Sequence, residues 1–253
     1  MIQIKNAKEL DGMRKANALS AAALKYGGEH IEAGMTTWEL DKLIYDFIVK
    51  HGGTPNFKGL YGFPGTACIS LNDTVIHGIP SHDIVIRPGD IVSIDTGAKI
   101  DGFNGDNACT FPCGKVDIEA QRLMDVTKES LHRGIAAAVA GNRVGDIGHA
   151  VQSYVEENGF SVVRSFVGHG VGKELHEDPE VPNYGHAGHG VRLVNGMTIA
   201  IEPMVNQKHH SVKTLSDGWT VVTADGGLAA HFEHSIAILP GGPEILTIGW
   251  EEP

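Results

Sequence analysis

Apolar side chains recur every three or four residues in four stretches of the chain, which is the periodicity of an amphipathic α-helix. Each stretch starts near a residue that caps helix N-termini, and three of them stop at glycine-containing pairs. The first start also has Glu9 three residues after Asn6, the pattern of a capping box. Counting the residues that cap or end them, the predicted helices cover residues 6–28, 36–53, 117–138 and 146–157.

Runs rich in β-branched and apolar residues lie between these helices, and their glycine, proline and aspartate boundaries are typical of β-strands. A turn over residues 87–90 leads into two longer runs on either side of Asp101–Gly102, a dipeptide that strongly favours a hairpin. Residues 74–80 are expected to form a loop. The other predicted strands cover residues 67–71, 160–163, 197–202, 219–222 and 228–239.

The hairpin brings two aspartates to one face of the predicted sheet. With its turn at Asp101–Gly102, residue 95 lies opposite residue 108, so Asp95 and Asp106 share a face as diagonal neighbours. Their Cβ atoms would be somewhat under about 7–8 Å apart. If buried, two such carboxylates repel each other, and a divalent cation between them would remove that cost. The alternative is a pair of solvated aspartates on an exposed hairpin.

The second helical pattern returns later in the chain. A shift of 107 residues carries Gly34 onto Gly141 and Gly52 onto Gly159, with the apolar helix positions between them in register. Such a repeat predicts two similar α+β halves facing each other, and a groove between the halves would collect strand residues from both. Two unrelated amphipathic helices would give the same pattern by coincidence.

The net charge of the 253-residue chain is −11, from 31 acidic and 20 basic side chains. Extended contact with nucleic acid or with an anionic membrane needs a basic surface, so we expect no stable nucleic-acid binding and no membrane partner. The sequence also shows no secretory signal peptide and no apolar run of membrane-spanning length.

The three cysteines are Cys68, Cys109 and Cys113, an odd number without a CxxC motif. They favour a reducing, cytoplasmic setting. Cys109 and Cys113 could form a metal-binding pair, but the hairpin already explains the first as a strand residue and the second as a residue near the strand end.

Four further residues suit metal or acid–base chemistry. His169 is flanked by glycines, which let a metal come close, and His176 follows in a His-Glu-Asp-Pro run. Glu202 and Glu233 each lie in an apolar strand, where a carboxylate needs a partner or a cation. Taken singly, each could instead be an ion-paired, edge or hydrogen-bonded residue.

Together with the aspartates, these residues form an oxygen-rich set with one imidazole, His169. Such a set suits Mn, Fe(II) or Co better than a zinc–thiolate site. Five ligands, several of them able to bridge, fit a centre with two ions about 3.5–4 Å apart. His77 and His176 then stay available for moving protons or holding a carbonyl oxygen.

Six short motifs resemble those of the methionine aminopeptidases over residues 1–239. They are Asp95 and Asp106 eleven residues apart, GHGVG at His169, HEDP at His176, IEPM at Glu202, FEHS at Glu233 and IHGIP at His77. The short gap between His176 and Glu202 is similar to type I of the family. The resemblance implies the α+β pita-bread fold, with two pseudo-symmetric halves, a central antiparallel sheet and outer helices. We expect one catalytic domain over 1–253, with halves near 1–115 and 116–253.

The resemblance also implies the activity: metal-dependent removal of the initiator methionine from proteins and peptides whose second residue is small. It assigns two divalent ions (Co, Mn or Fe(II), with Zn and Ni as further candidates). Their implied ligands are Asp95, Asp106, His169, Glu202 and Glu233, with Asp106 and Glu233 bridging.

The remaining catalytic roles are likewise carried over from the family. An activated water would attack the scissile carbonyl, and Glu202 would help move its proton. His176 would stabilise the oxyanion, and His77 would contact the scissile amide.

Seven mostly apolar or aromatic positions match the methionine pocket of the family, as a thioether side chain requires. They are Phe57, Leu60, Tyr61, Phe63, Cys68, Leu175 and Trp219. Positions 57, 60 and 175 differ from familiar members, which have Cys, Tyr and Phe there. Asn104 stands where the family usually has histidine, and Asn107–Ala108 also depart from the usual pattern.

The implied partners are peptides and nascent chains with N-terminal methionine, with transient ribosome contact, and the chain is expected to be a monomer. One alternative is an Xaa-Pro peptidase of the aminopeptidase P and prolidase group, which shares the fold and ligands but usually carries a further N-terminal domain. Another is an inactive pita-bread protein used for binding. His186 and His189 could suggest a second metal site, but a flexible loop explains them better.

Overall fold

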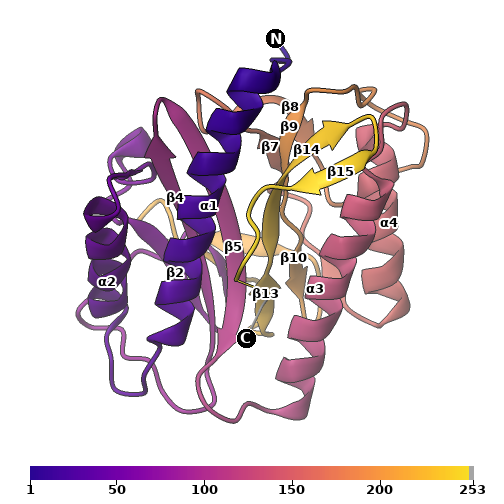
Figure 1. Cartoon of the computed structure of the whole chain (residues 1–253). Helices are drawn as coiled ribbons and strands as arrows, with labels where there is room; N and C mark the ends of the chain where they lie inside the picture. Colours follow the sequence, from indigo (N-terminus) through magenta and orange to yellow (C-terminus); the bar gives the residue numbers. More distant parts are fainter. Residues whose placement is uncertain (251–253) are drawn as a thin grey trace.

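A nine-stranded β-sheet, antiparallel in all its pairings, runs through the molecule in this computed structural model, which describes residues 1–250 (Figure 1). Its main path has the order β1-β4-β5-β14-β9-β7-β8, while β2 also pairs with β4 and β15 with β14. Its strands are β1 (Thr54–Pro55), β2 (Ala67–Leu71), β4 (Ile91–Ile100), β5 (Phe103–Pro112), β7 (Gly168–Gly170), β8 (Glu177–Val181), β9 (Thr198–Ile201), β14 (Glu233–Leu239) and β15 (Gly242–Ile245).

Two smaller antiparallel sheets, each of three strands, flank the large one. They join segments that are far apart in the sequence, since β3 pairs with β12 and β13 with β10. Their strands are β13 (Ala229–His231), β10 (Met204–Asn206) and β6 (Ser161–Val162) in one, and β11 (Val212–Thr214), β12 (Val221–Thr223) and β3 (Thr74–Ile76) in the other.

Four helices pack against the sheets, with α1 lying across β4 and β5 and the α3–α4 pair on the other side of the molecule (Figure 1). Asn6 and Thr36 close capping boxes at the starts of α1 and α2, as the sequence predicts for Asn6. The apolar faces of the helices and the sheet form the main core. The helices are α1 (Ala7–Glu29), α2 (Thr37–Lys50), α3 (Ile118–Ala137) and α4 (Val144–Glu157).

The α+β fold with two similar halves is confirmed, and the repeat extends to single residues. Helices α2 and α4 both have 14 residues, and the shift of 107 residues carries one onto the other. The same shift carries the isolated bridge Thr36–Val85 onto Arg143–Arg192. The halves join in the middle of the large sheet, where β5 pairs with β14.

Several boundaries differ from the sequence prediction, among them the three that follow. Helix α1 continues through its two glycines to Glu29. Helix α4 begins at Val144, because Asp146 is not its first residue but accepts a hydrogen bond from the backbone N–H of Arg143 at 2.7 Å. The strand expected over 219–222 is β12 and begins at Val221.

Two further predictions are wrong because they depend on distant pairing. The continuous strand expected over 228–239 is broken at Phe232, where the chain passes from the small sheet to the large one as β13 and β14. Residues 74–76 of the expected loop form β3, because β12 pairs with them. Among the helices of residues 1–250, none has the length and apolarity to cross a membrane.

Helix α1 approaches β5 so closely that the contact requires glycine. A Cβ atom on Gly105 would lie 2.4 Å from the carbonyl oxygen of Ala16. We expect Gly105→Ala to lower the free energy of unfolding by about 1–3 kcal/mol, because the clashing atom is backbone and cannot rotate away. Urea denaturation measures the change.

The matched control is Gly241→Ala, since Gly241 has no heavy atom within 4 Å of its would-be Cβ. This substitution should change the free energy of unfolding by less than about 0.5 kcal/mol. Equal effects of the two substitutions would show that the α1–β5 contact is not tight.

Candidate metal centre and substrate pocket

Strand register brings three carboxylates to one face of the large sheet. Asp95 of β4 pairs with Ala108 of β5, and Ala108 in turn pairs with Glu233 of β14. Directly paired residues point to the same face, as do residues two apart on one strand. Asp106, two residues before Ala108, therefore lies on the same face as Asp95 and Glu233. The hairpin predicts this shared face for Asp95 and Asp106.

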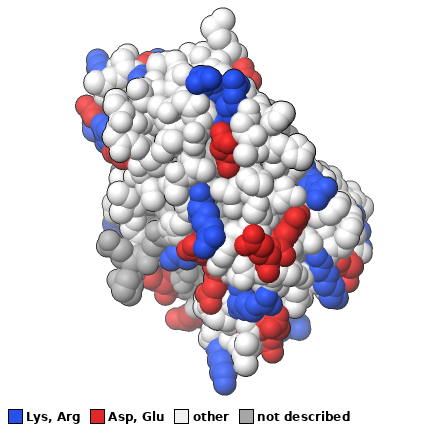
Figure 2. All heavy atoms as spheres, turned by 90° about the vertical axis from the view of Figure 1, so that its right-hand side faces the viewer, with Lys and Arg blue, Asp and Glu red and all other residues white. Residues whose placement is uncertain are grey.

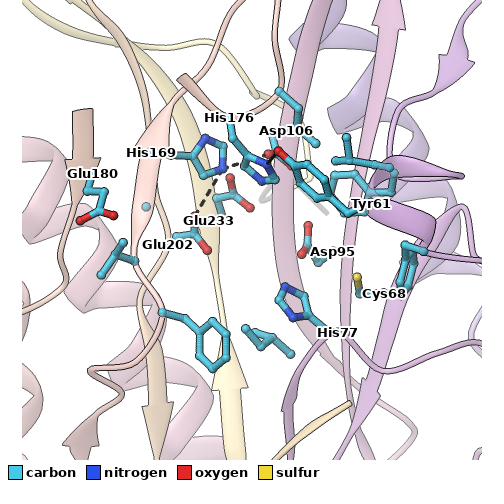
Figure 3. A pocket seen from close by; sticks show the side chains of 18 of the residues that line it. Tyr61, Cys68, His77, Asp95, Asp106, His169, His176, Glu180, Glu202 and Glu233 are labelled. Atoms are coloured by element: carbon cyan, nitrogen blue, oxygen red, sulfur yellow. Dashed lines mark hydrogen bonds and ion pairs between the residues drawn. The ribbon is translucent and has the colours of Figure 1, made fainter. Parts of the chain in front are cut away.

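Glu202 and His169 join this cluster from the second half of the chain. Glu202 follows the last residue of β9, and His169 lies in β7, the next strand. The Nε2 atom of His169 is 3.5 Å from Oδ2 of Asp106 and 3.6 Å from Oε1 of Glu202 (Figure 3). Asp106, His169 and Glu233 place ligand atoms within 4.8 Å of one another.

The carboxylates are poorly satisfied by the protein itself. Asp106 and Glu233 are only 3% and 2% exposed. Three buried oxygens, Oδ1 of Asp95, Oδ1 of Asp106 and Oε1 of Glu233, accept no hydrogen bond from any described residue. Buried polar atoms without partners are rare in proteins and costly. The arrangement therefore fits a hard divalent cation, which would use these oxygens as ligands.

The electrostatics of the cluster agree with this fit. Burial raises the pKa of Asp95 well above its usual value, and the charges of Asp106 and Glu202 raise it further. Burial likewise raises the pKa of Glu233, with Asp106 as the largest charge contribution. The pKa of Glu202 rises to about 8, again mainly through burial. Each negative charge in the cluster thus needs a positive one beside it.

Hydrogen bonds outside the cluster orient its members. Nδ1 of His169 lies 2.8 Å from the carbonyl oxygen of Gly170, which makes Nδ1 the donor and leaves Nε2 facing the carboxylates. The backbone N–H of Asp106 donates to Oδ1 of Asn17 on α1, and its carbonyl accepts from Ser235 on β14. Asp106, on the central hairpin, is thereby held by both halves.

All fourteen residues proposed from the sequence line one pocket of about 510 Å³, with the carboxylates on its inner side (Figure 3). The aromatic and aliphatic ones divide into two groups. Six form or pack against an apolar cluster: Phe57, Leu60, Phe63, Cys68, Leu175 and Trp219. Tyr61 is separate. It is 76% exposed, and its hydroxyl lies 3.5 Å from Nδ1 of His176.

The two histidines that are not in the ligand set also line the pocket. His77 is on the lower side in Figure 3, edge-on to Trp219, and burial lowers its pKa to about 4. His176 lies beside His169, with ring centroids 4.5 Å apart. Desolvation in the pocket lowers the pKa of His176, and the His169 ring lowers it further. Both imidazoles are therefore neutral at pH 7, with one N–H donor each.

Sequence reasoning missed His231. It is 1% exposed, and its Nε2 atom is 3.7 Å from Oε2 of Glu202. Burial lowers its pKa to about 3, so it stays neutral beside the centre. The sequence did contain a signal for His231, because it precedes Glu233 by two residues. The prediction of one continuous strand over 228–239 nevertheless gave this histidine no role.

Other residues stay outside the centre. His186 and His189 lie in an exposed loop with ring centroids 6.0 Å apart and belong to no metal-holding group of the described residues. Cys109 lies in β5 and Cys113 directly follows it, as the hairpin predicts. Both are buried thiols and are likewise not part of such a group of the described residues. Glu180 lines the pocket but lies apart from the carboxylate cluster (Figure 3).

Comparison with known proteins identifies relatives along almost the whole chain. Residues 11–240 match the model of metallopeptidase family M24. A methionine aminopeptidase of Clostridium perfringens is 55% identical over 248 residues, which cover 98% of this chain and 99% of that protein. The crystal structure of methionine aminopeptidase from Thermotoga maritima matches with a TM-score of 0.96 and 46% identity, covering 98% and 99% of the chains.

The prolidase of Pyrococcus furiosus is a more distant neighbour. It matches with a TM-score of 0.79 and 23% identity, covering 97% of this chain and 65% of that one. At this identity the likeness shows a common fold only, so the Xaa-Pro peptidase alternative is not favoured.

Metal binding should stabilise the fold measurably through this cluster. A cation at one hundred times its Kd adds about 2.7 kcal/mol to the free energy of unfolding. For a chain of this size, that corresponds to a rise in Tm of roughly 5–11 °C when Mn²⁺ or Co²⁺ is added to chelator-treated protein. Glu233→Gln should lose most of this rise and nearly all turnover, because an amide cannot replace an anionic ligand.

Glu180→Gln is the matched control, since Glu180 lines the same pocket outside the cluster. It should keep the full rise in Tm. In the metal-free state Glu233→Gln should be at least as stable as the unmodified chain, because one repelling carboxylate is gone. A full metal-induced rise in Glu233→Gln would remove Glu233 from the ligand set.

Proposed function

The chain belongs to metallopeptidase family M24 and, within it, to the methionine aminopeptidases, and on this premise we propose how its own residues remove the initiator methionine. The observation that carries the proposal is the group of buried carboxylates with unpartnered oxygens on the inner side of an apolar pocket. An inactive binding protein would have no need to keep these repelling charges together.

We propose that Asp95, Asp106, His169, Glu202 and Glu233 hold two divalent ions, with Mn, Fe(II) and Co preferred and Zn and Ni as further candidates. Four carboxylates offer more oxygens than one ion needs, which supports a pair. The charge of Asp106 raises the pKa of both Asp95 and Glu233, so Asp106 lies near both and would be held with them by the bound positive charge. When bound, such ions supply Lewis acidity, which polarises a carbonyl oxygen and lowers the pKa of water.

Glu202 is the residue we propose for proton movement. Its carboxylate lies between His169 and His231, with its Oε2 atom 3.7 Å from the His231 ring. A carboxylate that burial makes more basic accepts a proton from attacking water more readily than an exposed one. The same group can then return that proton to the leaving amine.

His77 and His176 are proposed to hold the scissile peptide from two sides. Because both rings are neutral, each offers one N–H without bringing a positive charge. His176 would donate to the carbonyl oxygen as negative charge develops on it. His77 would bind the scissile amide and fix the position of the second residue.

The apolar cluster is the proposed site of the methionine side chain. Phe63 and Trp219 meet edge to face with ring centroids 5.2 Å apart, and Cys68 and Leu175 complete the walls. Aromatic rings and a thiol make favourable contacts with an unbranched thioether. Tyr61, at the mouth, is proposed to contact the peptide rather than the methionine side chain.

Nascent chains with a small second residue are the proposed partners in the cell, met during transient contact with the ribosome by a monomeric enzyme. On the face shown in Figure 2, acidic and basic side chains are interspersed, and the basic ones form no large continuous patch. Together with a net charge of −11, this supports weak contact with nucleic acid rather than stable binding. The three thiols support a reducing compartment such as the cytoplasm.

A peptide series tests the substrate assignment. Met-Ala-Ser should be cleaved best, and norleucine should be tolerated in place of methionine because its shape is close. Leucine branches too early and should lower kcat/KM by about tenfold or more, since an apolar pocket discriminates by about 1–3 kcal/mol. Met-Leu-Ser should resist because its second residue is large. Chromatography of the released amino acid measures each rate.

Efficient release of leucine from Leu-Ala-Ser would contradict the assignment of the apolar cluster to methionine, but not the proposal that the chain is a peptidase. Preference for an Xaa-Pro peptide over Met-Ala-Ser would instead favour the prolidase-like alternative.

His176→Ala tests the proposed oxyanion donor. It should lower kcat by about 10²–10³, the usual loss for one such donor, with metal content unchanged. His186→Ala, in an exposed loop outside the pocket, is the control and should leave kcat unchanged. Loss of metal from His176→Ala would make His176 a ligand and refute this division of roles.

A further inference from the structure

The segment that carries His176 is held by a buried ion pair with the start of the chain. Lys5 is only 7% exposed, and its ammonium group pairs with the carboxylate of Glu177, the residue after His176. The side chains of the pair are 5% and 8% exposed. Lysine and glutamate are rarely buried unless paired, so this pairing is a condition for the local structure.

The pair lies directly against the backbone of the His176 segment. A Cβ atom on Gly172 would be 2.4 Å from Oε1 of Glu177 and 2.7 Å from Nζ of Lys5. The same Oε1 accepts a hydrogen bond from the backbone N–H of Glu174. Glu177 therefore closes the turn that precedes His176 and ties that turn to Lys5.

Lys5 is itself fixed in place. Its backbone N–H donates to the carbonyl of Gly196 at 2.8 Å, immediately before the strand that leads to Glu202. Its ammonium also donates to the carbonyl of Gln3. The other links between the two segments, Met1 to Asp178 and Lys173 to Glu9, are exposed and contribute little.

We propose that the Lys5–Glu177 ion pair is a positioning device for His176. Glu177 lines the pocket, Lys5 does not, and neither belongs to the carboxylate cluster. The pair acts by fixing the backbone on both sides of the imidazole. Removing one partner leaves a buried charge that draws the turn toward solvent. A displacement of about 1 Å in a reacting group can lower a rate by about a hundredfold. The inference rests on the proposed role of His176.

The test is a double-mutant cycle on kcat with Met-Ala-Ser, measured per metal-loaded folded site. Lys5→Met should lower kcat at least tenfold but not below the value of His176→Ala, with KM changed by less than about threefold. In the His176→Ala background, Lys5→Met should lower kcat no further. Lys15→Met, which breaks an exposed pair with Asp101, is the control and should leave kcat unchanged.

A second variant covers failure of Lys5→Met to fold. Lys5→Met with Glu177→Gln removes both charges and leaves no unpaired buried ion. It should fold and still lower kcat at least tenfold, because an amide and a thioether do not hold the turn as an ion pair does.

The outcomes separate the two hypotheses. If Lys5→Met lowers kcat by the same factor in the unmodified chain and in His176→Ala, the positioning role alone is overturned, since the lysine then acts independently of His176. Unchanged kcat per folded site, with only Tm reduced, would also overturn it. No loss in His176→Ala itself would overturn the proposed role of His176 and the inference together.

Discussion

Repulsion among buried carboxylates is the constraint on which this structure depends most. Asp95, Asp106 and Glu233 project from neighbouring strands of one sheet, and each has an oxygen that accepts no hydrogen bond within residues 1–250. Such a cluster opposes folding unless a cation binds it. The hydrophobic core on the other side of the same strands must therefore hold them in register, and a bound cation would offset part of the repulsion. Stability and activity are linked through the same few side chains.

The junction of the two halves explains how the register is held. In the large sheet the halves meet where β5 pairs with β14, and Asp106 and Glu233 lie on these two strands. Helix α1 seats directly on β5 through Gly105, and Asn17 of the same helix binds the backbone of Asp106. Displacement of one half against the other would separate the ligands. The positions of Asp95, Asp106 and Glu233 are thus set by paired strands and not by loops.

Local patterns were sufficient for the elements that depend on neighbours in the sequence. The Asp101–Gly102 turn predicts the pairing of residue 95 with 108, and the structure has this register. The predictions that failed concern residues whose structure depends on partners far away in the sequence. Nothing near Phe232 signals that the chain changes sheets there, and so His231 had no expected place beside Glu202. The Lys5–Glu177 pair, separated by 172 residues, has no local signal at all.

Asn104 shows why a departure from a family pattern can be read only in the structure. Its side-chain amide donates to the carbonyls of Gly172 and Lys173 at 3.0 and 2.9 Å, and its oxygen accepts from Asn56. A neutral imidazole has one N–H and could not serve both carbonyls, whereas an amide has two donors and an acceptor. The side chain is 2% exposed, so unmade bonds here would be costly. Asparagine therefore ties the strand that carries Asp106 to the turn that precedes His176. The strand that carries Asp106 and the segment that carries His176, the proposed oxyanion donor, are held by the same turn, which makes their separation a property of the fold.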